Sequence, residues 1–179
     1  MKGFTREYTQ FSLCGLNCLL CPMQVGGYCP GCGGGPGNQS CTIARCSLDR
    51  GGYAFCSQCL SYPCSRYEDF DSGDSFVPHS RRAADLARVG EVGLESYLSE
   101  LQTKREILDK LLADYNDGRR KALYCAAAYL LPLEDLQAAM TQLESRQELS
   151  LKERASAAAK LLQETAGKRD ISLKLNKKK

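Results

Sequence analysis

The 179-residue chain lacks the features that mark membrane, secreted and histidine-dependent catalytic proteins. It has no apolar run approaching the roughly 18 residues that a membrane helix needs. Its first residues, MKGFTREYTQFSL, lack the apolar core of a secretory signal peptide. It has a single histidine, so a Cys–His catalytic pair would have to use His79. These absences predict a cytoplasmic protein with no membrane partner.

Cysteine, by contrast, is abundant. Ten of the eleven cysteines fall between Cys14 and Cys64, and only Cys125 lies beyond them. Reducing compartments keep thiols from forming lasting disulfides, so a cytoplasmic chain with this many cysteines points first to a metal. The candidate metal ligands are Cys14, Cys18, Cys21, Cys29, Cys32, Cys41, Cys46, Cys56, Cys59 and Cys64.

The spacing of these cysteines favours zinc. Three pairs have the form C-x2-C, which lets both sulfurs of a tight turn reach one tetrahedral ion. The ten thiols would hold about two zinc ions, or three if some thiolates bridge. We expect CPGC and CSQC to form one site through Cys29, Cys32, Cys56 and Cys59, with the second site drawn from the other six.

Three other interpretations of the thiols stay open. The opening C-x3-C-x2-C triplet would also suit an iron–sulfur cluster, because zinc and iron–sulfur sites share thiolate ligands. The C-x2-C pairs would suit thiol redox chemistry. Buried, inert thiols are the remaining alternative, but such residues rarely pair at ligand spacing.

Composition divides the chain into three parts. Residues 1–79 combine the ten cysteines with turn-forming segments and show no sustained helical or strand period, which predicts an irregular cysteine-rich metal-binding lobe stapled by metal. Residues 80–166 predict a mainly α-helical lobe, and residues 167–179 a basic C-terminal tail that forms at most one short strand. The five expected helices cover 81–90, 93–116, 119–131, 133–147 and 151–167.

Local signals place the ends of these helices. Gly90 suits a C-cap, and Asn116 to Gly118 interrupts the apolar stripe of the second helix. Pro132 stands where a new helix can begin. Ser150 and Glu153 form the pattern of a capping box at the start of the last helix. Cys125 falls on an apolar helix, where we expect a buried, unreactive thiol.

The order of the cysteines resembles that of a known family. The segments CGLNCLLCP, CPGC, CTIARC and CSQCLSYPC are similar to the prokaryotic cysteine-rich family called domain of unknown function 3795, over roughly residues 12–112. All ten clustered cysteines match its pattern. Many relatives carry a further C-x-x-C after the helical segment, which this chain lacks. The resemblance implies metal binding and no assigned activity.

Charge and ligand type narrow the function. Residues 1–79 hold 5 Lys/Arg and 6 Asp/Glu, a net charge of −1 before any thiolate is counted, so this segment does not suit a phosphate backbone. All-cysteine zinc sites are typically closed, and no base, nucleophile or substrate pocket is indicated, so we do not expect an enzyme.

We expect a zinc-stabilised interaction or scaffold module whose partner is another protein. An iron–sulfur or thiol redox protein is the first alternative, and a nucleic-acid-binding zinc-knuckle protein the second. His79 would be a surface residue, a zinc ligand or a base.

Overall fold

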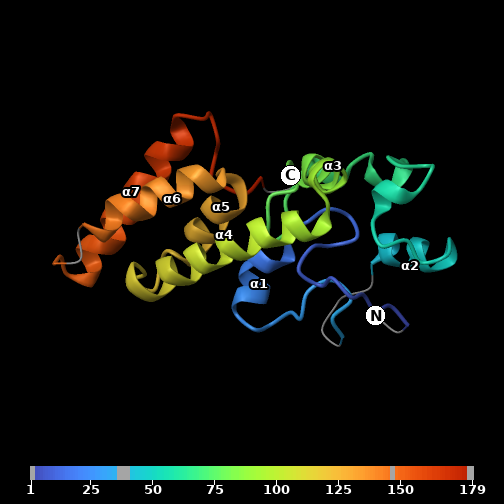
Figure 1. Cartoon of the computed structure of the whole chain (residues 1–179), viewed down its shortest axis with the longest axis horizontal. Coiled ribbons are helices and arrows are strands. Elements are labelled where there is room, and N and C mark those ends of the chain that lie inside the picture. The colour runs from blue at the N-terminus through green and yellow to red at the C-terminus, as the bar shows by residue number, and fades with distance from the viewer. Residues whose placement is uncertain (1–2, 36–40, 146–147, 177–179) are drawn as a thin grey trace.

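The computed structural model describes residues 3–35, 41–145 and 148–176. Over these ranges the chain is mainly helical and has no strand (Figure 1). Its only isolated bridge there joins Phe11 to Asn17. The α-helices are α1 (Pro22–Val25), α2 (Thr42–Asp49), α3 (Arg82–Val92), α4 (Leu94–Asp114), α5 (Lys121–Leu130), α6 (Leu133–Glu144) and α7 (Leu151–Gly167). The 3₁₀ helices are η1 (Cys18–Leu20), η2 (Cys56–Gln58), η3 (Ser65–Tyr67) and η4 (Phe70–Ser72). None of these helices is long and apolar enough to cross a membrane.

The five helices predicted after residue 80 are confirmed as α3 to α7. The predicted end of the first one is wrong, because α3 continues through Gly90 to Val92. Gly93 ends it instead, with a φ of 82° that favours glycine, and α4 begins at the next residue. The helix predicted to reach residue 147 ends at Glu144, and residues 146–147 lie outside the described part.

The capping box at the start of α7 is confirmed. The Ser150 N–H donates to the Glu153 carboxylate at 3.0 Å, and the Glu153 N–H donates to Ser150 Oγ at 3.4 Å. Each side chain therefore satisfies a backbone N–H that the first turn leaves without a partner.

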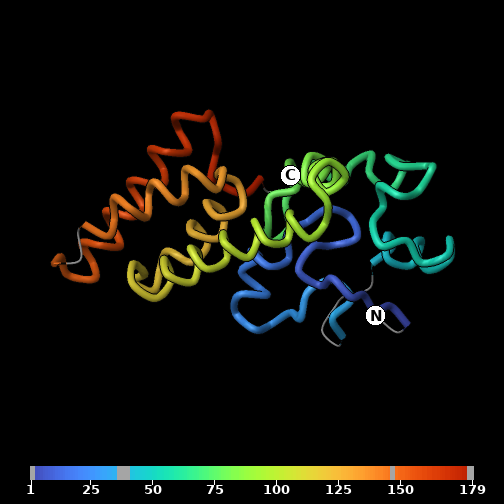
Figure 2. The backbone as a smooth tube through the Cα atoms, viewed as in Figure 1, coloured from blue at the N-terminus to red at the C-terminus, as the bar shows by residue number. Residues whose placement is uncertain are grey.

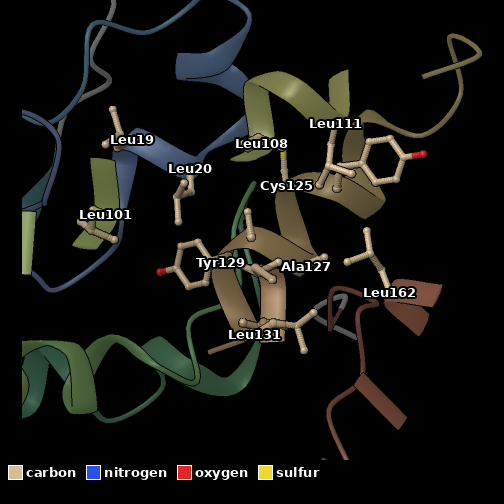
Figure 3. Packing of buried hydrophobic residues seen from close by; sticks show 14 of the residues in the cluster. Leu19, Leu20, Leu101, Leu108, Leu111, Cys125, Ala127, Tyr129, Leu131 and Leu162 are labelled. Carbon is tan, nitrogen blue, oxygen red and sulfur yellow. The ribbon is translucent and has the colours of Figure 1, made fainter. Parts of the chain in front are cut away.

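The main hydrophobic core lies around α5. Most of this helix is buried, including Tyr124, Ala127 and Tyr129, and it packs against α4, α6 and α7. Figure 3 shows α5 side chains between Leu108 and Leu111 of α4 on one side and Leu162 of α7 on the other. A helix that is apolar on most faces is the one that a bundle places at its centre.

The first cysteine-containing segment belongs to the same core. Phe11, Leu19 and Leu20 are buried in one cluster with side chains of α4 and α5, and η1 packs directly against both helices (Figures 1 and 3). The predicted boundary at residue 79 therefore has buried contacts running across it. The helices hold the opening cysteine loop in place.

The region after residue 40 is more regular than expected. Helix α2 was not predicted, although Ile43, Ala44 and Ser47 are its buried face at helical spacing. Ile43 and Ala44 join Phe4, Leu13 and Tyr67 in a second, smaller core cluster. The expectation that residues 1–79 show no sustained helical period is therefore wrong over α2. Helix α2 lies at the opposite end of the molecule from α6 and α7 (Figure 1).

The C-terminal tail returns to the body of the molecule. The Arg169 guanidinium pairs with Asp135 of α6 at 2.6 and 2.9 Å. Figure 2 shows the C-terminal segment (red) returning from the far end of the helices toward the middle of the molecule. Farther along, the Asp74 N–H donates to the Asn176 carbonyl and the Asn176 N–H donates to the Asp74 carboxylate, both at 2.7 Å. The described part of the tail therefore lies against residues 74–78, and no strand forms there.

Candidate metal centres

Nine of the eleven cysteines fall into two groups, each lining its own cavity. The four-cysteine site contains Cys46, Cys56, Cys59 and Cys64. The five-cysteine site contains Cys14, Cys18, Cys29, Cys32 and Cys41. Cys46, Cys56, Cys59 and Cys64 are free thiols. Over the described ranges, no set of three or more Cys, His, Asp or Glu side chains forms a ready ligand group for a metal ion. The thiols of each group thus line one cavity, but they are not clustered around a single position as the ligands of a metal ion are.

Three short elements bring the four-cysteine site together. Cys46 lies on α2, Cys56 opens η2 with Cys59 just after it, and Cys64 directly precedes η3. The Cys59 N–H donates to the Cys56 carbonyl at 3.0 Å, and the Tyr62 N–H donates to the Cys59 carbonyl at 2.9 Å. These bonds fold CSQC into a tight turn, the conformation that lets a C-x2-C pair address one ion.

The cavity of the four-cysteine site is small. Its volume is about 30 Å³, which has room for a single ion or a water or two and none for an organic ligand. Arg50 and Arg66 also line it, so cationic side chains stand where thiolates would gather negative charge.

One buried hydroxyl in this cavity lacks a partner. Tyr67 Oη is inaccessible to solvent and makes no hydrogen bond within the described structure. It is nevertheless close enough to Cys56 to affect its thiol: burial raises the Cys56 pKa, and the Tyr67 hydroxyl opposes that rise. A Cys56 thiolate would give this hydroxyl an acceptor. The Tyr67 ring is itself held by the Arg82 guanidinium, 4.2 Å from the ring centre.

The five-cysteine site has the larger cavity. Its cavity has a volume of about 200 Å³ and runs between the opening loop, CPGC and the start of α2. Cys14 is buried, and burial raises the pKa of its thiol to about 12. Ser12 Oγ lies 3.1 Å from Cys14 Sγ. Burial also raises the pKa of the Cys18 thiol, and the neighbouring Cys32 adds to the rise.

The CPGC loop packs tightly on the N-terminal segment. The Cys32 N–H donates to the Thr9 carbonyl at 3.0 Å. Gly31 has a φ of 89°, and a Cβ there would lie 2.3 Å from the Thr9 oxygen. Both the positive φ and the close contact that a Cβ would make restrict this position to glycine. Cys29 and Cys32 are therefore presented by a loop of fixed shape.

Cys21 lines neither cavity. It is the N-cap residue of α1, and its thiol has a pKa raised first by burial, with the nearby Cys29 thiol contributing. It is an additional thiol beside the five-cysteine site.

The structure groups the candidate ligands differently from the expected division. Cys29 and Cys32 line one cavity and Cys56 and Cys59 the other, so CPGC and CSQC lie at separate cavities. The pairing of CSQC with Cys46 depends on α2, which turns Cys46 toward η2 while Cys41, its N-cap residue, lines the other cavity. Without that helix, the sequence carries no signal that separates Cys41 from Cys46.

His79 is not a surface residue. It is 8% exposed, and its ring stacks on Phe70 with centroids 4.8 Å apart. Nδ1 lies 2.8 Å from the Phe70 carbonyl, and Nε2 accepts from the Ser75 N–H at 3.3 Å. These contacts engage both ring nitrogens. The ring is engaged as a structural residue, with neither nitrogen directed at a cysteine cavity.

Cys125 is buried, as predicted. It is 3% exposed on α5, and burial raises its thiol pKa to about 11. It lines neither cysteine cavity.

A polar network that the sequence did not reveal anchors the opening loop. Asn17 stands between Cys14 and Cys18 and is 2% exposed. Its Nδ2 donates to Asp85, its Oδ1 accepts from the Tyr97 hydroxyl, and its N–H donates to the Tyr129 hydroxyl. Nothing in the pattern C-G-L-N-C separates this asparagine from an ordinary turn residue.

No family model, curated protein or solved structure matches this chain. The resemblance to domain of unknown function 3795 therefore stays a prediction that depends on the cysteine order.

Proposed function

We propose that this protein binds zinc, with one ion at the four-cysteine site and a second at the five-cysteine site, and that both centres are structural. The observation that carries the proposal is the convergence of Cys46, Cys56, Cys59 and Cys64 on a cavity of about 30 Å³. Four thiols around a space the size of one ion are the donor set of a closed zinc site.

The surroundings of the four-cysteine site support a thiolate centre. Four thiolates on one zinc ion carry a net charge of about −2, which Arg50 and Arg66 would offset. The Tyr67 hydroxyl would donate to the Cys56 sulfur. Such outer partners hold ligands in orientation. Metal binding would draw the four sulfurs together around the ion, and the ion would contribute folding free energy to a region with a small core.

The five-cysteine site offers one thiol more than a closed four-coordinate ion uses, with Cys21 in addition. The proposed total is about two ions, or three if thiolates bridge. Because all the proposed ligands are cysteines, no position is left open for a substrate, and we propose no enzymatic activity.

The proposed role is that of an interaction or scaffold module, with a protein as partner. Two large apolar side chains project from the cysteine loops: Leu60, next to Cys59, is fully exposed, and Tyr28, next to Cys29, is 73% exposed. Exposed apolar side chains on rigid loops are suitable anchors for another protein. A nucleic-acid partner has less support, since residues 1–79 have a net charge of −1.

The second candidate function is an iron–sulfur protein, and one observation favours it. The cavity of the five-cysteine site, about 200 Å³, is larger than a single ion requires. Protein purified anaerobically that is brown and contains iron would support this candidate and contradict zinc at that site.

Elemental analysis of purified variants tests the proposal. The native chain should carry about two zinc ions. Cys59→Ser should lose one. Replacing Cys21, Cys29 and Cys32 together by serine leaves only three thiols at the five-cysteine site, so this triple variant should lose the other ion, and the variant that combines all four changes should lose both. If CPGC and CSQC shared one site, the combined variant would lose no more than Cys59→Ser or the triple variant alone. Cys125→Ala is the matched control and should lose none. A native chain free of zinc and iron would overturn the proposal.

A further inference from the structure

A further large cavity of the described structure is separate from both cysteine sites. Its volume is about 640 Å³, within the range of about 300–1,000 Å³ that is usual for small-molecule pockets. Four separated segments form it: the end of η1 with the start of α1, residues 75–78, one face of α5, and the C-terminal tail.

The lining of this cavity is almost entirely apolar. Leu20, Val77 and Cys125 are buried residues on its wall, and Leu123 and Leu173 are partly buried beside them. At the rim, Phe76 is 57% and Leu175 39% exposed.

The lining has two polar residues, Ser75 and Lys174, and they differ in whether they can bind a ligand. The Ser75 hydroxyl lies 2.9 Å from His79 Nε2 and is engaged there. Lys174 is the one charged residue that the cavity has within the described ranges, and it makes no ion pair with them. The cavity therefore combines a long apolar wall with a single available cation at its edge.

The tail that carries Lys174 is held in place. Asn176 in this tail makes two hydrogen bonds of 2.7 Å with Asp74, one donated by the backbone N–H of each residue. Asp74 immediately precedes the cavity-lining segment 75–78. Lys174 is thus presented by a fixed wall, which lowers the cost of using it to orient a ligand.

We propose that this cavity binds a medium- or long-chain carboxylic acid, with the alkyl chain along α5 and residues 76–78 and the carboxylate at Lys174. The apolar length of the wall fits an alkyl chain, and burial of that chain supplies the affinity. The lone cation selects an anionic end group.

Calorimetric titration of the full, metal-containing chain tests this. The probe is decanoate, kept below its micelle-forming concentration. We expect saturable binding of one decanoate per chain. Ala122→Trp fills the cavity from an exposed position of α5 and should weaken decanoate binding at least about tenfold. Ala138→Trp, an equally exposed position of α6 away from the cavity, is the control and should bind as the native chain does.

Charge reversal tests the position of the carboxylate. Lys174→Glu should weaken decanoate binding roughly fivefold and leave the binding of neutral 1-decanol unchanged. Lys152→Glu, on the exposed surface of α7, should affect neither. Absence of saturable decanoate binding would overturn the proposal. So would equal losses in Ala122→Trp and Ala138→Trp, or equal losses for decanoate and decanol in Lys174→Glu.

Discussion

The side chain of Asn17 donates to the Asp85 carboxylate at 3.0 Å in the interior of the molecule. Both residues are almost fully buried. The bond connects the loop between Cys14 and Cys18 to α3, and the Tyr97 and Tyr129 hydroxyls extend the network to α4 and α5. A loop that carries two candidate metal ligands is thus fixed by hydrogen bonds to three helices, independently of any metal.

We expect Asn17→Leu to lower the free energy of unfolding by about 2–4 kcal/mol, because it leaves Asp85 and Tyr97 buried without their partner. Urea denaturation of the metal-containing chain measures it. Gln163→Leu makes the same kind of change at an exposed position of α7 and should cost less than about 0.5 kcal/mol. Equal effects of the two variants would contradict the structural role of Asn17.

The Asp85 carboxyl predicts a pH dependence. Burial raises its pKa above the usual value, although Arg81 and the network oppose the rise. The native state therefore holds this proton at a pH where the unfolded chain, with a pKa of about 3.9, has released it. Between these two pKa values the contribution of Asp85 to stability falls as pH rises.

Asp85→Asn should remove that part of the pH dependence. The measurement is urea denaturation of the native chain and the variant from about pH 4 upward. As the pH rises, the unfolding free energy of the native chain should fall relative to that of Asp85→Asn. A difference that is constant with pH would show that the folded Asp85 pKa is normal.

Two cations cap the end of α5. Lys104 Nζ donates to the Leu131 carbonyl at 2.7 Å, and the Arg81 guanidinium donates to the Leu130 carbonyl at 3.1 Å. These carbonyls have no partner within the helix, and cations are favourable at this end of the helix dipole. Burial lowers the Lys104 pKa, so the buried charge is also costly. We expect Lys104→Met to lower stability by about 1–2 kcal/mol, as measured by urea denaturation. An unchanged stability would mean that the free energy gained by no longer burying the Lys104 charge equals the free energy lost with its hydrogen bond to Leu131.

The sequence was informative where one local signal decides the outcome. The apolar periods of α3 to α7 and the Ser150–Glu153 capping box each depend on neighbours in the chain, and these elements were predicted. The division of the cysteines between the two cavities was not predicted, because it depends on which face of α2 packs on Leu13 and Tyr67. Asn17 was missed for the same reason: its partners are 68 to 112 residues away.

Gly31 allows the shape of the CPGC loop to be tested without touching a thiol. Gly31→Ala should loosen the five-cysteine site, because the new Cβ would lie 2.3 Å from the Thr9 oxygen and the φ of 89° is unfavourable for alanine. Gly27→Ala is the matched control: its φ is 75°, but a Cβ there meets nothing within 4 Å. We expect Gly31→Ala to release one zinc ion to a chelator at least about tenfold faster than Gly27→Ala does. Equal rates would show that the contact with Thr9 does not shape the site.

Removal of metal should affect the two core clusters differently. Phe11, Leu19 and Leu20 are buried with the helices, so residues 11–25 should stay protected from hydrogen exchange after chelation. Residues 41–70 have the smaller cluster around Ile43 and Tyr67, and their order should depend on the proposed ion at the four-cysteine site. Exchange measured by mass spectrometry should therefore rise at residues 41–70 and little at α4 and α5. In Cys59→Ser the region should exchange rapidly before any chelator is added, whereas Cys125→Ala should behave as the native chain. Equal deprotection of α5 and α2 on chelation would contradict this account, since it would mean that the metal supports the whole fold.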